Sequence, residues 1–173
     1  MNNTDKSIVL IGFMGVGKTS IGKYLAEALN WEFIDTDEII ENDFNMPTSS
    51  IFKEFGENAF REKEKEVIEQ ISMKQHKIIS VGGGAFLQKA NREACLNRCR
   101  VVLLELSWLA WQERYPLIID TRPVLQQRTM NEIQDLYNER KEIYAEHHYR
   151  ITIDGLTIEQ ASEKILITIN DGN

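Results

Sequence analysis

Residues 7–20, Ser-Ile-Val-Leu-Ile-Gly-Phe-Met-Gly-Val-Gly-Lys-Thr-Ser, join a short apolar run to a glycine-rich segment. The run is too short for a buried helix and is rich in β-branched residues, so it predicts a strand of a parallel sheet that is covered on both faces. The segment that follows matches the spacing GxxxxGK[ST], with its defining residues at Gly12, Gly17, Lys18 and Thr19. We expect the rest of the chain to be organised around this strand, loop and helix.

Each residue type in this loop has a physical role in holding a triphosphate. Glycines permit positive φ angles and carry no Cβ atom, so successive backbone N–H groups can turn toward phosphate oxygens. Lys18 adds a mobile positive charge, Thr19 offers a hydroxyl ligand for Mg²⁺, and the helix that begins here directs the positive end of its dipole at the same anion. A glycine turn that only joins a strand to a helix is the weaker interpretation, because it does not account for the Lys-Thr pair. The predicted ATP-binding residues of this loop are Gly12, Met14, Gly15, Val16, Gly17, Lys18, Thr19 and Ser20.

The composition indicates a single domain over residues 1–173, because 42% of the chain is hydrophobic, enough for one sizeable core. The 20 basic and 27 acidic residues give a net charge of −7, which argues against a nucleic-acid partner or a membrane surface, since either would favour a basic face. The polar N-terminus has no signal-peptide core, and no run of about 18 apolar residues occurs, so we expect a cytoplasmic protein. Cys95 and Cys99 are expected to be reduced, partly buried thiols.

Strand and helix patterns alternate along the chain, which predicts an α/β fold with a parallel sheet between two layers of helices. The expected strands span residues 7–11, 31–34, 77–81, 100–106 and 149–153. The expected helices span residues 18–29, 48–73 with a division at Gly56, 107–114, 129–148 and 157 onward. Capping boxes mark the starts of the last two helices at Thr129-Met130-Asn131-Glu132 and Thr157-Ile158-Glu159-Gln160.

One segment, residues 115–127, breaks this alternation. It has no clear apolar period and holds two of the three prolines, and Arg114, Arg122 and Arg128 lie within or beside it. These features suit a mobile lid over an anionic ligand, at about residues 114–128, better than they suit a packed element.

Acidic and glycine residues follow the second and third expected strands. Asp35 and Asp37 lie two apart, so they point the same way in an extended segment. Ligands bind beyond the carboxyl ends of such strands, where Mg²⁺ near one carboxylate and a substrate hydroxyl on the other would relieve their repulsion. Gly82-Gly83-Gly84 offers unhindered backbone to the same ligand. The alternatives are a solvated acidic turn for the aspartates and a tight turn, needing one glycine, for the triplet.

Two arginines fall on or beside apolar helical stripes, where a solvated charge is not expected. Arg140 shares a helical face with Ile133, Leu136, Tyr137 and Tyr144. Arg61 follows Phe60, and Glu64 lies one turn away to hold its guanidinium. A half-buried arginine favours a planar anion such as a carboxylate, so the two together suggest a small acidic substrate. A structural ion pair is the alternative for each of them.

In this order and spacing, the motifs resemble those of the shikimate kinases, small P-loop enzymes of the nucleoside-monophosphate-kinase-like type. The resemblance extends from about residue 8 to the last helix. The motifs that carry it are the loop 12–19, Asp35-Thr36-Asp37, Phe60-Arg61-Glu62-Lys63-Glu64, Gly82-Gly83-Gly84, Arg122-Pro123, and Arg140 four residues before Tyr144. It implies a sheet of strand order 2-3-1-4-5 and transfer of the ATP γ-phosphate to the 3-hydroxyl of shikimate, a step of aromatic amino-acid biosynthesis.

The resemblance also implies how the nucleotide is held. Lys18 would contact the β and γ phosphates, and Thr19 and Asp35 would hold Mg²⁺, Asp35 through water. Arg122 would close onto the phosphates during transfer, and Arg114 resembles the arginine that stacks on adenine. The residues between these two arginines are more apolar than is usual in lids of this family.

On the acceptor side, the resemblance implies that Asp37 takes the proton from the attacking hydroxyl. Asp37, Lys18 and Arg122 would then be the catalytic residues. The residues implied to bind shikimate are Asp37, Phe52, Phe60, Arg61, Gly82, Gly83, Gly84 and Arg140.

Two alternative functions are compatible with much of the same pattern. The first is another small-metabolite kinase of this fold, such as a gluconate or nucleotide kinase, although the paired arginines and the triple glycine favour a carboxylate-bearing polyol. The second is a catalytically silent, nucleotide-binding regulatory domain, which would not need Lys18, Asp35, Asp37 and Arg122 together. We expect a monomer whose small-molecule partners are shikimate and ATP with Mg²⁺.

Overall fold

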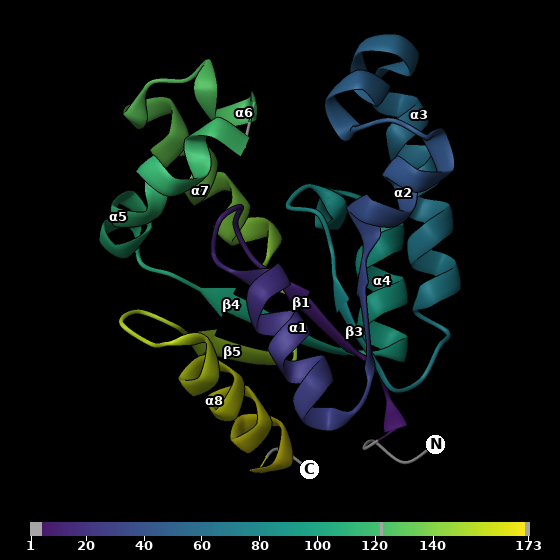
Figure 1. Cartoon of the computed structure of the whole chain (residues 1–173), viewed down its shortest axis with the longest axis vertical. Helices are drawn as coiled ribbons and strands as arrows, with labels where there is room; N and C mark the ends of the chain where they lie inside the picture. Colours follow the sequence, from purple (N-terminus) through teal and green to yellow (C-terminus); the bar gives the residue numbers. More distant parts are fainter. Residues whose placement is uncertain (1–4, 122, 172–173) are drawn as a thin grey trace.

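The computed structural model describes residues 5–121 and 123–171, which build a five-stranded sheet between layers of helices (Figure 1). The strands are β1 (Ile8–Ile11), β2 (Glu32–Asp35), β3 (Lys77–Ser80), β4 (Arg100–Glu105) and β5 (Tyr149–Thr152). Their order is β2-β3-β1-β4-β5, and each strand is parallel to its neighbours. The predicted three-layer α/β fold and its strand order are confirmed.

Helices cover both faces of the sheet. They are α1 (Lys18–Leu29), α2 (Thr36–Phe44), α3 (Thr48–Ile71), α4 (Lys89–Arg98), α5 (Trp108–Ile118), α6 (Pro123–Gln126), α7 (Met130–Ile143) and α8 (Ile158–Asp171), with 3₁₀ turns η2 (Ala85–Leu87) and η3 (Ile119–Thr121). Figure 1 shows α1 and α8 in front of the sheet and α4 behind it, with α2 and α3 rising on one side and α5 to α7 on the other. In the part of the chain described, no helix has the length and apolarity needed to cross a bilayer.

β1 is the centre of the sheet because all of its residues are apolar and can be buried on both faces. Its four side chains are at most 1% exposed. Leu10 lies in register with Ser80 of β3 on one side and with Val102 of β4 on the other. The carboxyl ends of these strands therefore meet at one edge of the sheet, and the glycine loop after β1 lies at the middle of that edge.

α7 ends at Ile143, so the prediction of a helix to residue 148 is wrong at its end. Tyr144 caps the helix, and the chain then turns to join the sheet. The N–H of His148 donates to the carbonyl of Val101 (3.0 Å), and its Nδ1 accepts from the N–H of Val101 (2.9 Å). These residues leave the helix because they pair with β4 instead.

Other local predictions are confirmed. Gly56 interrupts α3 with non-helical backbone angles, φ 82° and ψ 165°. Thr129 and Thr157 each form a reciprocal capping pair, with Glu132 and Gln160 respectively. Such caps depend on residues three apart, so sequence alone locates them well.

The segment predicted to lack regular structure is helical over most of its length. α5 continues to Ile118 and is followed by η3 and α6, while Arg122 lies outside the described residues. The helical period is present in Trp111, Tyr115 and Ile118, whose spacings of four and three bring them to one face. All three pack against the core, so the prediction of an irregular loop is wrong.

Cys95 and Cys99 are buried free thiols, as predicted. Burial raises the pKa of Cys99 to about 11, so its thiol is protonated at neutral pH. Burial raises the pKa of Cys95 as well. Neither cysteine has the thiolate character of a reactive site.

The cap of α7 provides a test of the fold, because this helix carries Arg140. Replacing Thr129 by Ala removes the side-chain half of the capping box, the hydroxyl that accepts from the N–H of Glu132, and is expected to lower the free energy of unfolding by about 1 kcal/mol in urea denaturation. Thr168→Ala is the matched control, because that hydroxyl donates only to the Lys164 carbonyl of its own helix α8. The control should change stability by less than about 0.5 kcal/mol, and equal losses in the two variants would contradict the capping role.

Candidate active site

The loop between β1 and α1 has the backbone geometry that its motif predicts. Gly12, Gly15 and Gly17 have φ angles of 147°, 80° and 100°, which residues with a side chain rarely adopt. Lys18 begins α1, and its Nζ donates to the carbonyls of Gly12 (2.8 Å) and Phe13 (3.3 Å). The lysine is thus folded along a loop that sits at a helix N-terminus, a position that favours anions.

Helix α5 is fastened to this loop by three side chains. Nε1 of Trp111 donates to the carbonyl of Met14 (2.8 Å), and Nη1 of Arg114 donates to the carbonyl of Val16 (3.1 Å). Ile118 lies so close to Gly15 that a Cβ atom there would be 2.4 Å from its Cδ1. An apolar side chain therefore rests on the loop that is predicted to hold phosphate.

Asp35, at the end of β2, links the loop to α2. One of its carboxylate oxygens accepts from the N–H of Asp37 (3.0 Å) and so caps α2, and the other accepts from the hydroxyl of Thr19 (3.3 Å). Thr19 and Asp35 thus present oxygen atoms side by side, and oxygen is the ligand that Mg²⁺ prefers. Across residues 5–121 and 123–171 no three His, Cys, Asp or Glu side chains gather as a metal site, so a cation here would depend mostly on substrate oxygens and water.

Asp37 is half-buried, and its carboxylate has unmet hydrogen-bonding capacity. Its Oδ1 is inaccessible to solvent and has no hydrogen-bond partner among the described residues. The pKa of Asp37 is raised to about 6, mainly by burial and then by the negative charges of Asp35 and Glu64, while Lys18 lowers it. Asp37 is therefore charged at neutral pH and is more basic than an ordinary aspartate.

The turn after β3 packs directly against two of the predicted site residues. A Cβ atom on Gly82 would lie 2.7 Å from Oδ1 of Asp37, and one on Gly84 would lie 2.5 Å from Nη2 of Arg61. Real Cβ atoms do not approach other atoms this closely, so any larger residue would displace the carboxylate or the guanidinium. Two glycines are needed here for close approach, which a simple tight turn does not explain.

Hydrogen bonds fix the same turn from two further elements. The N–H of Gly82 donates to Oγ1 of Thr36 (3.3 Å), the first residue of α2. The carbonyl of Gly83 accepts from the hydroxyl of Tyr144 (2.7 Å) at the end of α7. The backbone of the turn therefore sets the spacing between α2, α3 and α7.

Arg61 projects from α3 and is held by two glutamates. Its Nη1 donates to both carboxylate oxygens of Glu64 (3.1 and 2.9 Å), and its Nε donates to Glu57 (3.2 Å). Glu64 is completely buried, whereas the Glu57 side chain is 65% exposed. The predicted contact between Arg61 and Glu64 is confirmed, and it leaves Nη2 beside Gly84.

Arg140 lies on α7, one turn before Tyr144. Its Nη1 is buried and has no hydrogen-bond partner in the part of the chain that the structure describes. The residues predicted to share its face, Ile133, Leu136, Tyr137 and Tyr144, are all buried. A buried guanidinium nitrogen in this state is expected to meet an anion, because an unpaired buried donor is costly.

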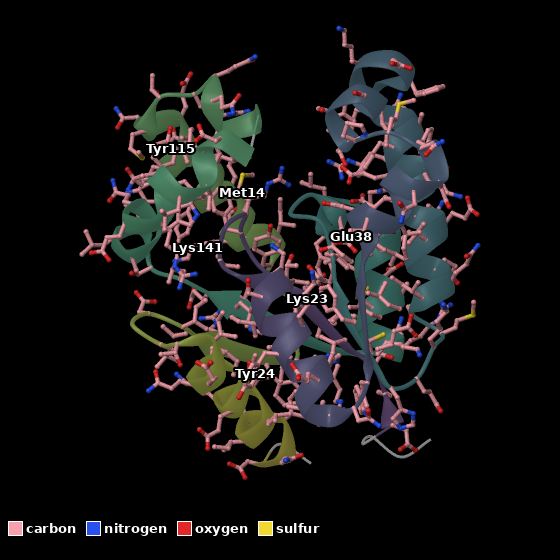
Figure 2. All side chains as sticks on the ribbon, in the orientation of Figure 1. Met14, Lys23, Tyr24, Glu38, Tyr115 and Lys141 are labelled. Atoms are coloured by element: carbon pink, nitrogen blue, oxygen red, sulfur yellow. The ribbon has the colours of Figure 1, made fainter. Side chains whose placement is uncertain are left out.

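The structure places several of the remaining predicted residues. Phe52 and Phe60 form an edge-to-face pair with ring centres 4.9 Å apart. Ser20 lies on the exposed side of α1, and Arg122 is outside the described residues. Figure 2 shows Met14 in the glycine loop, with Tyr115 on the α5 side of it and Glu38 on the α2 side.

Sequence reasoning missed the contacts that Trp111, Ile118 and the Tyr144 hydroxyl make. Each joins a side chain to backbone atoms at least 60 residues away, at Met14, Gly15 and Gly83, so no local spacing reveals it. The helical period of α5 was the one pattern that could have placed Trp111 and Ile118 on the same face.

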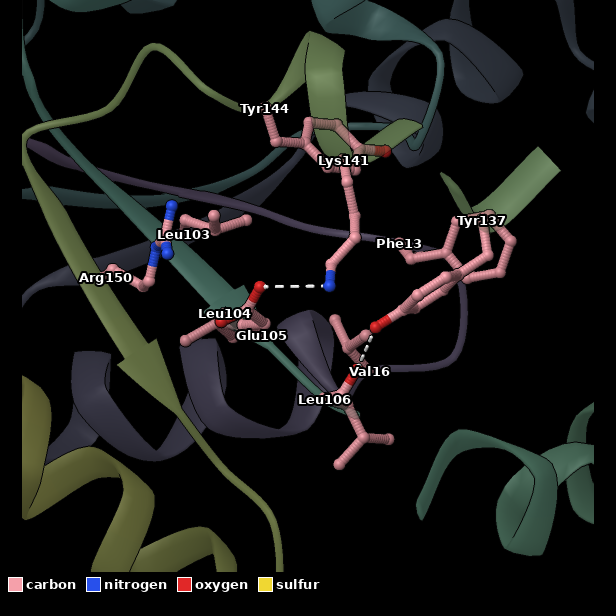
Figure 3. A pocket seen from close by; sticks show the side chains of 10 residues that line it. All are labelled: Phe13, Val16, Leu103, Leu104, Glu105, Leu106, Tyr137, Lys141, Tyr144 and Arg150. Carbon is pink, nitrogen blue, oxygen red and sulfur yellow. Dashed lines mark hydrogen bonds and ion pairs between the residues drawn. The ribbon is translucent and has the colours of Figure 1, made fainter. Parts of the chain in front are cut away.

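A cavity of about 230 Å³ lies next to this site and not within it. Figure 3 shows Tyr137, Lys141 and Tyr144 of α7 facing Leu103 to Leu106, with Phe13 and Val16 of the loop at its side. Lys141 lies 3.6 Å from Glu105, and the Tyr137 hydroxyl donates to the carbonyl of Leu106 (2.7 Å). Its lining includes none of Asp37, Arg61 and Gly82–Gly84, so this cavity is not the predicted acceptor site.

Comparison with known proteins joins these observations. A family model described as shikimate kinase matches residues 14–170, almost the whole described chain. The chain belongs to the shikimate kinase family. The shikimate kinase of Oceanobacillus iheyensis is 50% identical to it over 161 residues, which are 93% of this chain and 88% of that relative.

Solved structures agree with this family assignment. A shikimate kinase from Acinetobacter baumannii in complex with shikimate superposes with a TM-score of 0.90 at 32% identity, and the match covers 99% of this chain and 96% of that one. A gluconokinase from Sinorhizobium meliloti reaches a TM-score of 0.57 at 17% identity, a likeness of fold alone. The chain thus lies within the shikimate kinases and shares only its architecture with the gluconokinase.

The buried charge of Asp37 is expected to lower stability at neutral pH. Its pKa is about 6 in the folded protein and is expected near 3.8 in the unfolded chain, so the folded state binds the proton more tightly and stability falls as the pH rises between these values. Since one pKa unit corresponds to about 1.4 kcal/mol, Asp37→Asn should raise the free energy of unfolding at about pH 8 by up to about 3 kcal/mol, and by much less near pH 4.

Chemical denaturation at these two pH values measures the effect. Asp135→Asn, at an exposed position on α7, is the matched control and should change stability little at either pH. A loss of stability in Asp37→Asn at about pH 8 would show that the charged form is stabilised in the fold.

Proposed function

We propose that this protein transfers the γ-phosphate of ATP to the 3-hydroxyl of shikimate, giving 3-phosphoshikimate and ADP. The observation that supports this most directly is a pair of buried atoms without hydrogen-bond partners in the described ranges, Oδ1 of Asp37 and Nη1 of Arg140. Such a carboxylate oxygen favours a hydroxyl donor, and such a guanidinium nitrogen favours an anion. Shikimate carries hydroxyl groups and a carboxylate on one small ring, and membership of the shikimate kinase family supports the same acceptor.

In this proposal the glycine loop binds the phosphates of ATP. Lys18, now folded onto loop carbonyls, turns to the β and γ phosphates, and Thr19 and Asp35 hold Mg²⁺. The bound cation would neutralise charge on the phosphates as the bond to the γ-phosphorus breaks. Arg114 is proposed to contact adenine, and Arg122, which lies outside the described residues, to approach the γ-phosphate.

Asp37 is proposed as the base. Its carboxylate accepts the proton of the 3-hydroxyl as that oxygen forms a bond to the γ-phosphorus, while the bond from the γ-phosphorus to the bridging oxygen breaks and leaves its electrons on ADP. A pKa of about 6 keeps Asp37 ionised at neutral pH and makes it a stronger proton acceptor than an ordinary aspartate.

Arg61 and Arg140 are proposed to bind the carboxylate of shikimate from two helices. Guanidinium groups match the planar, two-oxygen geometry of a carboxylate better than ammonium groups do. Gly82–Gly84 would allow the ring to approach the backbone, and Phe52 and Phe60 would wall it on the apolar side. Because two charged groups on separate helices must meet one ligand, positioning is a large part of the expected catalysis.

Two alternatives are distinguished by their chemistry. Gluconate also carries a carboxylate and hydroxyl groups, but it is an open chain, which the edge-to-face phenylalanine pair would wall less well than a ring. A silent nucleotide-binding domain has no need of the buried, unpaired charge on Asp37, which costs stability. We further propose that the protein acts as a monomer in the cytoplasm.

Release of ADP from ATP and Mg²⁺ tests the proposal. Release is expected with shikimate and not with quinate or gluconate, and kcat/KM for shikimate should fall below about pH 6 as Asp37 becomes protonated. Asp37→Asn should lower kcat by at least about 100-fold while ATP binding stays within about twofold. Undiminished turnover in this variant would exclude Asp37 as the base, and ATP binding without release for any acceptor would favour the silent domain.

Ile118 provides a second test, because in this structure its side chain covers Gly15 of the loop. Bound phosphate would have to displace it, so Ile118→Ala is expected to tighten ATP binding by about three- to tenfold in calorimetry. Leu117→Ala is the matched control, because that side chain is 82% exposed, and it should leave the affinity unchanged. Unchanged or weaker binding in the Ile118 variant would mean that the contact does not oppose the nucleotide.

A further inference from the structure

We infer that Gln88 is a positioning residue for the acceptor site, and that its side-chain amide holds the Glu64 carboxylate and the α3 backbone so that Arg61 faces the turn Gly82–Gly84. Gln88 precedes α4 and is separated from that turn only by η2. The inference rests on the proposed function, since the ligand that Arg61 meets there is taken to be the carboxylate of shikimate.

The contacts of Gln88 are specific for an amide. Its Nε2 donates to Oε2 of Glu64 (3.0 Å) and to the carbonyl of Arg61 (3.1 Å). Both hydrogens of one nitrogen are thus used, one on a side chain and one on the backbone of the same helical turn. No other residue type of this length supplies two donors and no charge.

Glu64 needs this donor because its carboxyl group is buried away from solvent. Its two carboxylate oxygens meet Nη1 of Arg61 and Nε2 of Gln88. Two other negative groups face this region, Glu57 on α3 and Asp37 on α2. The charge of Glu57 raises the pKa of Glu64, and the charge of Glu64 raises the pKa of Asp37. Burial raises the pKa of Glu64, while Arg61 and Gln88 lower it.

Without the Gln88 amide, Arg61 is expected to move toward Glu57. Nε of Arg61 already donates to Glu57, whose side chain is 65% exposed, so the guanidinium has a second partner toward solvent. A weaker Glu64 partner would shift Arg61 toward Glu57 and away from Gly84. The cation would then be absent from the place where the acceptor carboxylate is proposed to bind, while the glycine loop would be unaffected.

The decisive variant is Gln88→Met, which keeps the length of the side chain and removes both donors. The KM for shikimate is expected to rise about fivefold or more, with kcat and the KM for ATP within about twofold of the wild type. Gln70→Met is the matched control, because the Gln70 amide also donates to a glutamate of α3, Glu66, but at an exposed site. The control should change none of the three constants.

Direct binding of shikimate at several pH values separates positioning from general damage. In Gln88→Met the pKa of Glu64 should rise further, so the ratio of variant to wild-type Kd should grow as the pH is lowered. In Gln88→Glu the ratio should shrink as the pH is lowered. A second carboxylate repels Glu64 at high pH, but its protonated form can donate a hydrogen bond to Glu64 at low pH.

Each outcome bears on the inference. Opposite pH trends in the two Gln88 variants support it, and an unchanged KM for shikimate in both would overturn it. Equal losses in kcat and in both KM values, or a ratio of Kd values that does not vary with pH in either variant, would show a structural role only and would also overturn it. Thermal unfolding of each variant confirms that the folded protein is being measured.

Arg61→Ala separates this inference from the proposed function. Suppose that the wild type shows shikimate-dependent ADP release and that Arg61→Ala weakens shikimate binding far more than ATP binding. The proposed carboxylate site is then supported, whether or not Gln88 positions Arg61. If Arg61→Ala weakens both ligands equally, or the wild type does not use shikimate, the proposed function fails first. A large effect of Arg61→Ala with no effect of Gln88→Met would overturn the inference about Gln88 and leave the proposed function supported.

Discussion

The close packing of the turn Gly82–Gly84 against side chains from three helices is the constraint on which the site depends. Asp37 of α2 and Arg61 of α3 lie too close to Gly82 and Gly84 to leave normal room for a Cβ atom, and Tyr144 at the C-terminal cap of α7 holds the carbonyl between them. The turn therefore brings the Asp37 carboxylate, the Arg61 guanidinium and the end of the helix that carries Arg140 close together. The turn directly follows β3, so the register of β3 with β1 and β2 sets the position of the turn and of the predicted acceptor residues around it.

The second constraint is the burial of charged atoms of Asp37 and Arg140. Asp37 and Arg140 each keep a buried polar atom without a partner in the described chain, which costs stability in the free protein. Burial, together with the negative charges of Asp35 and Glu64, raises the pKa of Asp37. Such an arrangement is hard to explain as a device for folding, but it suits a site whose hydroxyl and carboxylate ligand supplies the missing bonds.

The predicted nucleotide-binding loop is held differently, because its backbone carbonyls accept hydrogen bonds from side chains. Lys18, Trp111 and Arg114 all donate to carbonyls of the glycine loop, and Ile118 lies on Gly15. The loop is thereby held in shape by side chains of α5. Among the predicted acceptor residues, Arg61 instead donates to Glu64, which also accepts from Gln88.

Sequence by itself determined what depends on near neighbours: the strand and glycine loop of residues 7–20, the alternation of strands and helices, the break at Gly56 and the capping boxes at Thr129 and Thr157. It also predicted Asp35, Asp37, Arg61 and Arg140 as site residues, because motif spacing and helical faces are local. It did not give the helical course of residues 115–118 or the end of α7, where packing on the core and pairing with β4 override weak local preference. Only the tertiary structure decided that Gln88 reaches Glu64, that Tyr144 holds Gly83 and that Ile118 covers Gly15, since these contacts join segments from 24 to 103 residues apart and exist only once the sheet has set their positions.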